Sequence, residues 1–238
     1  MEYEKAKPHL IAYIDILGTS EMLASGKSDE FIHTVDLAYK SWLEVVGILQ
    51  TLGFPKINIK TFSDNILLSC PFEEASPLES QSKLASILSH ICRFQGTMLL
   101  KNHLLTRGGV CFGDLVWNET LVLGAGLVEA HMLESRIAIY PRIVFSDTFF
   151  RLVKQFLPNR IEDHILQDQD GVYYVNFMHN PKVGIDKNEV DKATRFCRSQ
   201  IELLESQPHK NLRAIQNYKW AFSTIARMWM NHKNSTGS

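Results

Sequence analysis

One short apolar run near the start of the chain most limits the folds that the sequence can adopt. It reads LIAYIDIL over residues 10–17 and is bounded by Pro8 and Gly18. The run is too short and too β-branched for a stable helix, so it predicts a buried strand. That strand carries one acid, Asp15. A lone ionised carboxylate is costly in apolar surroundings, so Asp15 must be paired, hydrogen-bonded or bound to a metal.

The elements expected after this strand come in the order helix, hairpin, helix, strand. They are an amphipathic helix at about 28–52, strands at 57–62 and 66–70, a helix at about 80–102 and a strand at 104–112. Gly108 and Gly109 in the last strand predict either a bulge or a close approach of the backbone to another group. The order is that of a ferredoxin-like split βαβ core, an α+β fold with a mainly antiparallel sheet and helices on one face.

The second half of the chain continues without a linker rich in Pro, Gly or Ser. A short strand at 121–123, a helix at 127–137 and a strand at 141–145 are expected, followed by a short helix, a strand at 172–177 and two periodic helices. Residues 1–238 therefore predict a single domain, with a core at about 8–146 and a helical C-terminal extension at about 147–233. Aromatic and methionine residues near Trp220 and Met230 are expected to pack in the core or a dimer, and docking of a partner protein is the alternative.

Composition excludes several classes of function. Lys and Arg number 25 against 26 Asp and Glu, so the chain lacks the basic surface that nucleic acid requires. No apolar stretch is long enough for a membrane span, and the start is too polar for a signal peptide, which predicts a cytoplasmic protein. The four cysteines lie far apart without a CxxC pair, so neither a zinc site nor a disulfide framework is indicated.

Two aspartates suggest a site for divalent cations. Asp15 ends the first strand and Asp64 lies in the hairpin turn, and a split βαβ sheet brings these two points to the same edge. Carboxylate oxygens at that edge are ligands for Mg²⁺ or Mn²⁺. Taken singly, each has a structural alternative: Asp15 as the buried partner of an arginine, and Asp64 as an ordinary turn residue.

Phosphate groups would find donors beside these acids. Gly18, Thr19 and Ser20 directly follow the first strand, and exposed backbone N–H groups in such a turn can bind phosphate oxygens. Arg107 in the later strand is a candidate bidentate clamp for the same phosphates, and an arginine facing solvent is the alternative.

Three motifs in this region resemble those of class III nucleotidyl cyclases. They are DILGTS at 15–20, IKTFSD at 59–64 and RGGVCFG at 107–113, and the resemblance covers roughly residues 8–146. It implies that Asp15, Asp64 and the Ile16 carbonyl bind two Mg²⁺ or Mn²⁺ ions. One ion would acidify the ribose 3′-OH, and the other would hold the leaving pyrophosphate.

The resemblance also implies roles for two basic residues and for a second subunit. Arg107 matches a residue that contacts the triphosphate. Lys60 falls where adenylate cyclases place a lysine that reads the base, in an active site shared across a homodimer.

The chain departs from the family where the family recognises its base. Leu121 stands at the position of a base-reading acid, and Val128 and Met132 replace the usual transition-state Asn and Arg. Three nearby charged residues are candidates for the missing role, although ion pairs along a helix face explain them equally well: Glu129, Glu134 and Arg136.

This altered pattern, with RIAIYPRI at 136–143, is similar to the pyrimidine cyclases of bacterial anti-phage Pycsar systems. That similarity implies synthesis of cyclic UMP or cyclic CMP from UTP or CTP after infection, and a separate effector protein that senses the product. Loss of the purine-reading acid fits a smaller base. An adenylate cyclase, favoured by Lys60, and a catalytically silent nucleotide-binding module of the same fold are the alternatives.

Overall fold

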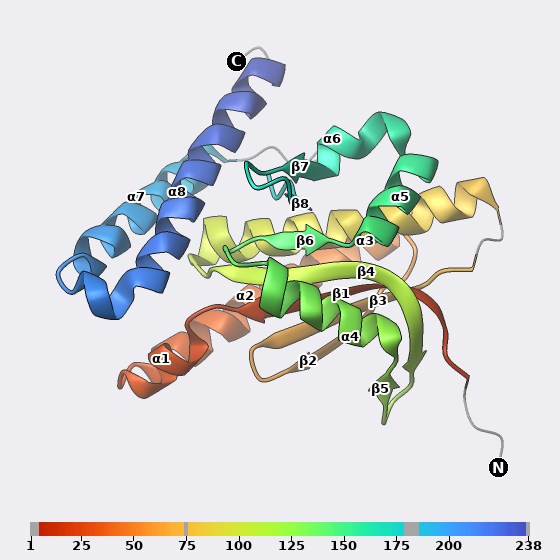
Figure 1. Cartoon of the computed structure of the whole chain (residues 1–238), viewed down its shortest axis with the longest axis horizontal. Helices are drawn as coiled ribbons and strands as arrows, with labels where there is room; N and C mark the ends of the chain where they lie inside the picture. The colour runs from red at the N-terminus through yellow and green to blue at the C-terminus, as the bar shows by residue number, and fades with distance from the viewer. Residues whose placement is uncertain (1–4, 74–75, 179–185, 237–238) are drawn as a thin grey trace.

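The computed structural model describes residues 5–73, 76–178 and 186–236 and contains a mixed sheet of eight strands (Figure 1). Seven strands run in the order β2-β3-β1-β4-β6-β8-β7, and β5 pairs with β4 alone. The strands are β1 (Lys7–Ile16), β2 (Asn58–Phe62), β3 (Asn65–Pro71), β4 (Thr106–Trp117), β5 (Val122–Leu123), β6 (Ile143–Phe145), β7 (Ile165–Gln167) and β8 (Tyr173–Val175).

Eight α-helices lie between the strands along the chain and after the last strand in the described residues. They are α1 (Thr19–Ala24), α2 (Ser28–Thr51), α3 (Pro77–Gly96), α4 (Ala125–Met132), α5 (Asp147–Phe156), α6 (Ile161–His164), α7 (Lys187–Leu204) and α8 (Pro208–Thr236). Two π-helical turns, η1 (Thr97–Lys101) and η2 (Leu133–Ile137), continue α3 and α4, and η3 (Pro158–Arg160) is a 3-10 turn. Among the described residues, no helix has the length and apolar character to span a bilayer.

The strand β1 lies at the centre of the fold and has two different faces. It pairs antiparallel with both β3 and β4. Because side chains alternate along a strand, Leu10, Ile14 and their even-numbered neighbours enter the main core with α2 and α3. On the other face, Ile11 joins a smaller cluster with Cys111 and Ala130 beneath α4. Figure 1 accordingly shows α4 in front of the sheet and α2 and α3 behind it. The α+β core predicted from the sequence is confirmed, with α4 added on the second face.

Several boundaries differ from the expected ones for local reasons. The second long helix begins at Pro77, because the Ser76 side chain accepts a hydrogen bond from the Glu79 N–H and proline suits the first turn. The predicted strand at 104–112 continues to Trp117, where β5 pairs with it. The short helix α1 and the strand β7 were not expected.

The C-terminal helices are fastened to the sheet by a buried arginine. Arg142 is fully buried, and its guanidinium lies 2.9 Å from Asp168 and 2.5 Å from Asp170. From α8, Trp220 donates an indole N–H to the same Asp168 at 2.8 Å. Trp220 is itself buried. Tyr218, Phe222 and Trp229 also pack against the core, which supports the packing interpretation for the aromatic residues of α8. Met230, in contrast, is 64% exposed.

We expect Asp168→Ala to lower the free energy of unfolding by about 3 kcal/mol, because it leaves the buried Arg142 charge without one of its partners. Urea denaturation followed by circular dichroism measures the change. Asp36→Ala is the matched control, since its ion pair with Lys40 is exposed and should contribute less than about 1 kcal/mol. Equal effects of the two substitutions would contradict the role of the Arg142 cluster.

Candidate active site on the α4 face of the sheet

The candidate site begins with a pair of residues that face each other across two strands. Asp15 on β1 is the register partner of Arg107 on β4. The Arg107 Nε donates to Asp15 Oδ2 at 3.3 Å. Both side chains lie on the face that carries α4, because they share the parity of Ile11 and Cys111. The structural alternative for Asp15, an arginine partner, is thus present in the same place as the predicted site.

Glu134 completes this pair from the helical side. It lies in the π-helical turn η2, is 3% exposed, and places Oε1 2.5 Å from the same Arg107 Nε. Its other oxygen lies 3.5 Å from His131 Nδ1, which realises the helix-face interaction that the sequence also allowed. One arginine therefore lies between two carboxylates from different elements.

The absence of a side chain at Gly109 permits this approach. A Cβ atom there would lie 2.2 Å from the Ala130 carbonyl oxygen and 2.5 Å from the Leu133 Cβ. Both distances are far below van der Waals contact, so a larger residue would push α4 and η2 away from the strand. The close approach, one of the two alternatives predicted for the glycines, is confirmed at Gly109.

Burial and like charge disfavour the ionised forms of the acids. Burial raises the pKa of Asp15 to about 6; Arg107 opposes this rise, and Glu134 and Asp64 add to it. Burial also raises the pKa of Glu134, against the effect of Arg107. The ionised forms of Asp15 and Glu134 are thus disfavoured although both lie against one guanidinium, an arrangement that would favour an additional cation.

Asp64 lies beside the end of β1, as the sequence predicted. The Asp64 carbonyl accepts a hydrogen bond from the Ile16 N–H at 3.2 Å, which joins the hairpin turn to the first strand. Its side chain accepts from Asn65 Nδ2 at 3.1 Å. Ser63, before it, has a φ of 53°, a left-handed conformation that turns the chain between β2 and β3.

The turn after β1 has its own local structure. Gly18 has a φ of 85°, in the left-handed region that glycine adopts without strain, and Thr19 begins α1. The Thr19 hydroxyl donates to the Ile16 carbonyl at 2.9 Å. That carbonyl retains a second lone pair, and Ser20 follows within the first turn of the helix.

The donor chemistry fits hard divalent cations. Asp15, Asp64 and the Ile16 carbonyl offer oxygen atoms at one edge of the sheet, and the surrounding acids exceed the nearby positive charge. Within the described residues there is no group of three or more His, Cys, Asp or Glu side chains arranged to hold a metal ion. A metal here would therefore depend on the two aspartates, a backbone carbonyl and groups from a substrate.

Lys60 does not join Asp15 and Arg107. Its ammonium donates to the carbonyls of Asn118 at 2.6 Å and Glu119 at 3.2 Å, in the turn between β4 and β5. Leu121 closes the same turn, where its N–H donates to the Asn118 side chain, and it is 45% exposed. The two predicted base-recognition residues are therefore close to one another but belong to a separate part of the surface.

The outer surface of α4 and η2 is apolar. Val128 is 55% exposed and Met132 is 42% exposed. They line an open groove of about 560 Å³ whose other walls are Ala125, Glu129, Leu133, Arg136 and Ile137. Glu129 and Arg136 thus border this groove, whereas Glu134, the third charged candidate, points inward to Arg107.

Two neighbours of the site were not selected from the sequence. Tyr13 lies two residues before Asp15 on the same face, and its ring packs edge-on against His131 at 5.2 Å between centroids. Burial raises the pKa of Tyr13, and Glu134 and Asp15 contribute to that rise. The sequence could have indicated Tyr13, because residues two apart on a strand share a face and Tyr13 is two residues from Asp15. It could likewise have indicated His131, because residues three apart on a helix are neighbours and His131 precedes Glu134 by three.

We expect Asp15 to weaken the fold as pH rises from about 4 to about 6 in the absence of divalent ions. The pKa of Asp15 is about 6 in the folded chain and near 4 when unfolded, so the folded state binds more protons in this interval. Asp15→Asn should therefore be more stable than the natural chain by about 1–2 kcal/mol at pH 7.5, and no more stable at pH 4. Urea denaturation at both pH values measures this, and a difference independent of pH would contradict it.

Sequence comparison gives no relative, since no protein-family model and no curated protein matches the chain. Solved structures do match. The guanylyl cyclase domain of the RhoGC fusion protein from the aquatic fungus Blastocladiella emersonii aligns with a TM-score of 0.53 at 13% identity, over 74% of this chain and 98% of that chain.

Two further structures give the same result. The guanylate cyclase domain of RhGC from Catenaria anguillulae, in complex with GTP, aligns with a TM-score of 0.50 at 13% identity, over 73% of this chain and 98% of that chain. The catalytic core of a rhodopsin-guanylyl cyclase with converted specificity, in complex with ATPαS, aligns with a TM-score of 0.51 at 14% identity, over 74% of this chain and 98% of that chain. The chain therefore has the fold of the class III nucleotidyl cyclases, extended at its C-terminus by helices.

Proposed function

We propose that the chain is a metal-dependent nucleotidyl cyclase that converts UTP or CTP to the 3′,5′-cyclic nucleotide and pyrophosphate. The observation that carries this proposal is the meeting of Asp15 and Asp64 at one edge of a cyclase-fold sheet, with Arg107 directly across from Asp15. In the reaction, the ribose 3′-oxygen bonds to the α-phosphorus, and the bond from that phosphorus to pyrophosphate breaks.

Asp15, Asp64 and the Ile16 carbonyl would hold two Mg²⁺ or Mn²⁺ ions in this proposal. When bound, the ions supply acidification of the 3′-OH and positive charge for the leaving pyrophosphate. The N–H groups at Gly18, Thr19 and Ser20 bind phosphate oxygens beside them.

Arg107 changes partners during substrate binding in this mechanism. The Arg107 Nε lies between Asp15 and Glu134. With Asp15 as a ligand of a bound metal ion, Glu134 would hold the guanidinium and orient it toward the triphosphate. Glu134 is thus a positioning residue, and Arg107 is the residue that touches substrate.

A pyrimidine substrate is supported by the apolar surface where a base would lie. Leu121, at the position of the family's base-reading acid, presents a hydrocarbon side chain in place of a hydrogen-bonding group. A purine loses the paired contact at its edge in such surroundings, whereas a smaller base needs fewer contacts. We further propose, on the resemblance to pyrimidine cyclases, that the cyclic product signals phage infection to a separate effector.

A homodimer completes the active site in this proposal. The residues expected to read the base, Lys60 and Leu121, lie apart from Asp15 within one chain. The exposed apolar groove on α4 is a surface that a second copy would cover. Each chain contributes one domain, with the core at about 8–146 and the extension at about 147–233.

Two alternative functions remain distinguishable by experiment. An adenylate cyclase is favoured by the position of Lys60, although its ammonium is already bound to two carbonyls. A silent nucleotide-binding module is favoured by Val128 and Met132, which cannot replace the transition-state contacts of Asn and Arg.

Incubation with each of the four nucleoside triphosphates and Mn²⁺ should yield a cyclic product and pyrophosphate from UTP or CTP, identified by mass spectrometry. Asp15→Ala and Asp64→Ala should abolish turnover, and Glu134→Gln should lower kcat at least about tenfold through loss of Arg107 orientation. Glu202→Gln, at an exposed residue of α7, is the matched control. Turnover of ATP alone would overturn the pyrimidine assignment, and nucleotide binding without pyrophosphate release would favour the silent module.

Mixing two inactive chains tests the shared active site. Asp64→Ala and Lys60→Ala place their defects in the two different halves of the proposed site, so a mixed dimer contains one intact site. The mixture should recover about a quarter of the natural activity, because about half of the dimers are mixed and each has one working site of two. Activity no higher than that of either variant alone would refute sharing.

A further inference from the structure

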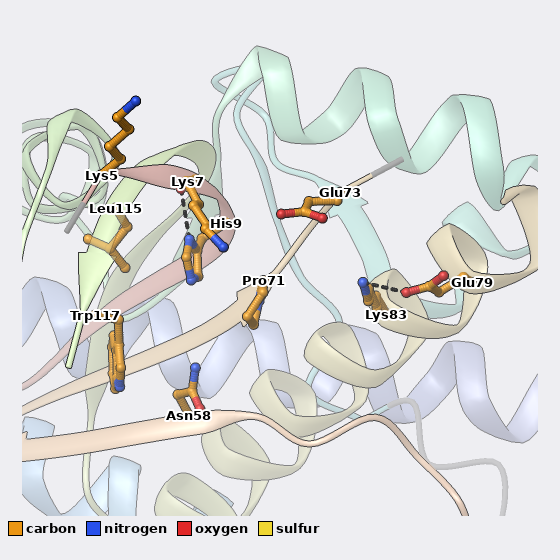
Figure 2. Close-up of a pocket in the computed structure, with 10 residues that line it drawn as sticks. All are labelled: Lys5, Lys7, His9, Asn58, Pro71, Glu73, Glu79, Lys83, Leu115 and Trp117. Atoms are coloured by element: carbon orange, nitrogen blue, oxygen red, sulfur yellow. Dashed lines mark hydrogen bonds and ion pairs between the residues drawn. The ribbon is translucent and has the colours of Figure 1, made fainter. Parts of the chain in front are cut away.

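A second pocket lies at the opposite end of β1 from Asp15, and we name it the basal pocket. It has a volume of about 340 Å³ and is lined by Lys5, Lys7, His9, Asn58, Pro71, Glu73, Glu79, Lys83, Leu115 and Trp117 (Figure 2). These residues come from the starts of β1, β2 and α3, from the ends of β3 and β4, and from the segments beside β1 and β3. The volume is in the range of pockets that hold small ligands.

The basal pocket is separate from the cluster of Asp15, Arg107 and Glu134, although its Trp117 wall borders Lys60. His9 precedes Asp15 by six residues on one extended strand, which corresponds to about 20 Å at 3.3 Å per residue. None of its lining residues belongs to the Asp15, Arg107 and Glu134 cluster or to the α4 groove. A ligand bound there would therefore leave the metal-binding edge accessible.

The charges of the pocket favour a ligand with one negative charge. Three lysines stand against two glutamates, which leaves one net positive charge. Lys83 already pairs with Glu79 at 2.7 Å. Among the described residues, Lys7 and Glu73 make no ion pair, so Lys7 retains donors for an anion and Glu73 retains acceptors for hydroxyl groups.

His9 gives the pocket a buried polar wall. His9 is 5% exposed, and its Nδ1 lies 2.8 Å from the Lys7 carbonyl oxygen. Since a carbonyl only accepts, Nδ1 carries the proton, and Nε2 is the ring atom left to accept a hydrogen bond from a ligand hydroxyl. Figure 2 shows the ring standing beneath Lys7, above the space bounded by Trp117 and Asn58.

The remaining walls suit a planar ring. Trp117 contributes an indole ring, with the Lys60 ammonium over one face at 5.6 Å from the ring centroid, and Asn58 offers both a donor and an acceptor. An aromatic wall beside an amide is the combination that stacks on a nucleobase and bonds to its edge. Base, ribose and a singly charged phosphate each meet a suitable group here.

We propose that the basal pocket binds a cyclic nucleotide: the phosphodiester faces Lys7, the ribose hydroxyl donates to His9 Nε2, and the base lies against Trp117 and Asn58. A cyclic phosphodiester carries one negative charge, which matches the net charge of the pocket, whereas a triphosphate brings about four charges toward Glu73 and Glu79. The identity of the ligand rests on the proposed function, because a cyclase would itself supply the cyclic nucleotide as its product. The pocket would then report product concentration to the enzyme.

Calorimetric titration of the full-length chain with cyclic UMP, in EDTA so that no turnover occurs, tests the proposal directly. Lys7→Ala should weaken binding at least about tenfold, because it removes a charged hydrogen bond to the phosphate. Lys7 is exposed, so the variant should fold as the natural chain does. Lys27→Ala, an exposed lysine in the turn between α1 and α2, is the matched control and should bind normally.

Further arms locate the ligand and define its chemistry. Trp117→Phe should abolish the change in tryptophan emission on binding, and UTP and inorganic phosphate should compete at least about tenfold more weakly than cyclic UMP. Absence of saturable binding, equal competition by inorganic phosphate, or binding weakened by Arg107→Lys but unaffected by Lys7→Ala would each overturn the proposal. Because the cyclic nucleotide is supplied ready-made, these results stand whether or not the chain proves to be a cyclase.

Discussion

The antiparallel register between β1 and β4 is the constraint on which the site depends. It places Asp15 directly across from Arg107, and a slip of one residue would send one of the two side chains to the opposite face of the sheet. The same register sets Gly109 beneath α4, so that the helix approaches closely enough for Glu134 to reach the guanidinium. The hydrophobic pattern of β1 fixes this register, because its even positions must enter the main core.

The cluster of Asp15, Arg107 and Glu134 is electrostatically unfavourable for the acids, which a neutral side chain in the same place would avoid. Burial and neighbouring acids raise the pKa of Asp15, which means that its ionised form is held in unfavourable surroundings at neutral pH. A chain selected only for stability would place a neutral side chain there. Such costs are typical of sites that bind charge, since the added cation then relieves the repulsion.

Much of this architecture could be predicted from the sequence, because local patterns govern it. The apolar run at 10–17, the hairpin around Asp64 and the two glycines of β4 are readable from neighbouring residues alone. The role of Glu134 could not be predicted, because the sequence did not distinguish Glu134 from Glu129 and Arg136. Only the structure shows that Glu134 is the one that points toward the sheet. The hydrogen bonds from Lys60 to the Asn118 and Glu119 carbonyls could not be predicted from the sequence either, because that turn lies nearly sixty residues from Lys60 along the chain.

The buried Arg142 has a consequence for how the molecule opens. Its guanidinium is tied through Asp168 to Trp220 of α8, and its backbone carbonyl accepts the Gly108 N–H at 3.1 Å, immediately beside Arg107. The amide of Gly108 can exchange with solvent only when that contact breaks, and the contact is anchored by the C-terminal helix. The strand bearing Arg107 and the last helix of the chain therefore belong to one cooperative unfolding unit, so the lifetime of the site is set partly by residues more than a hundred positions away.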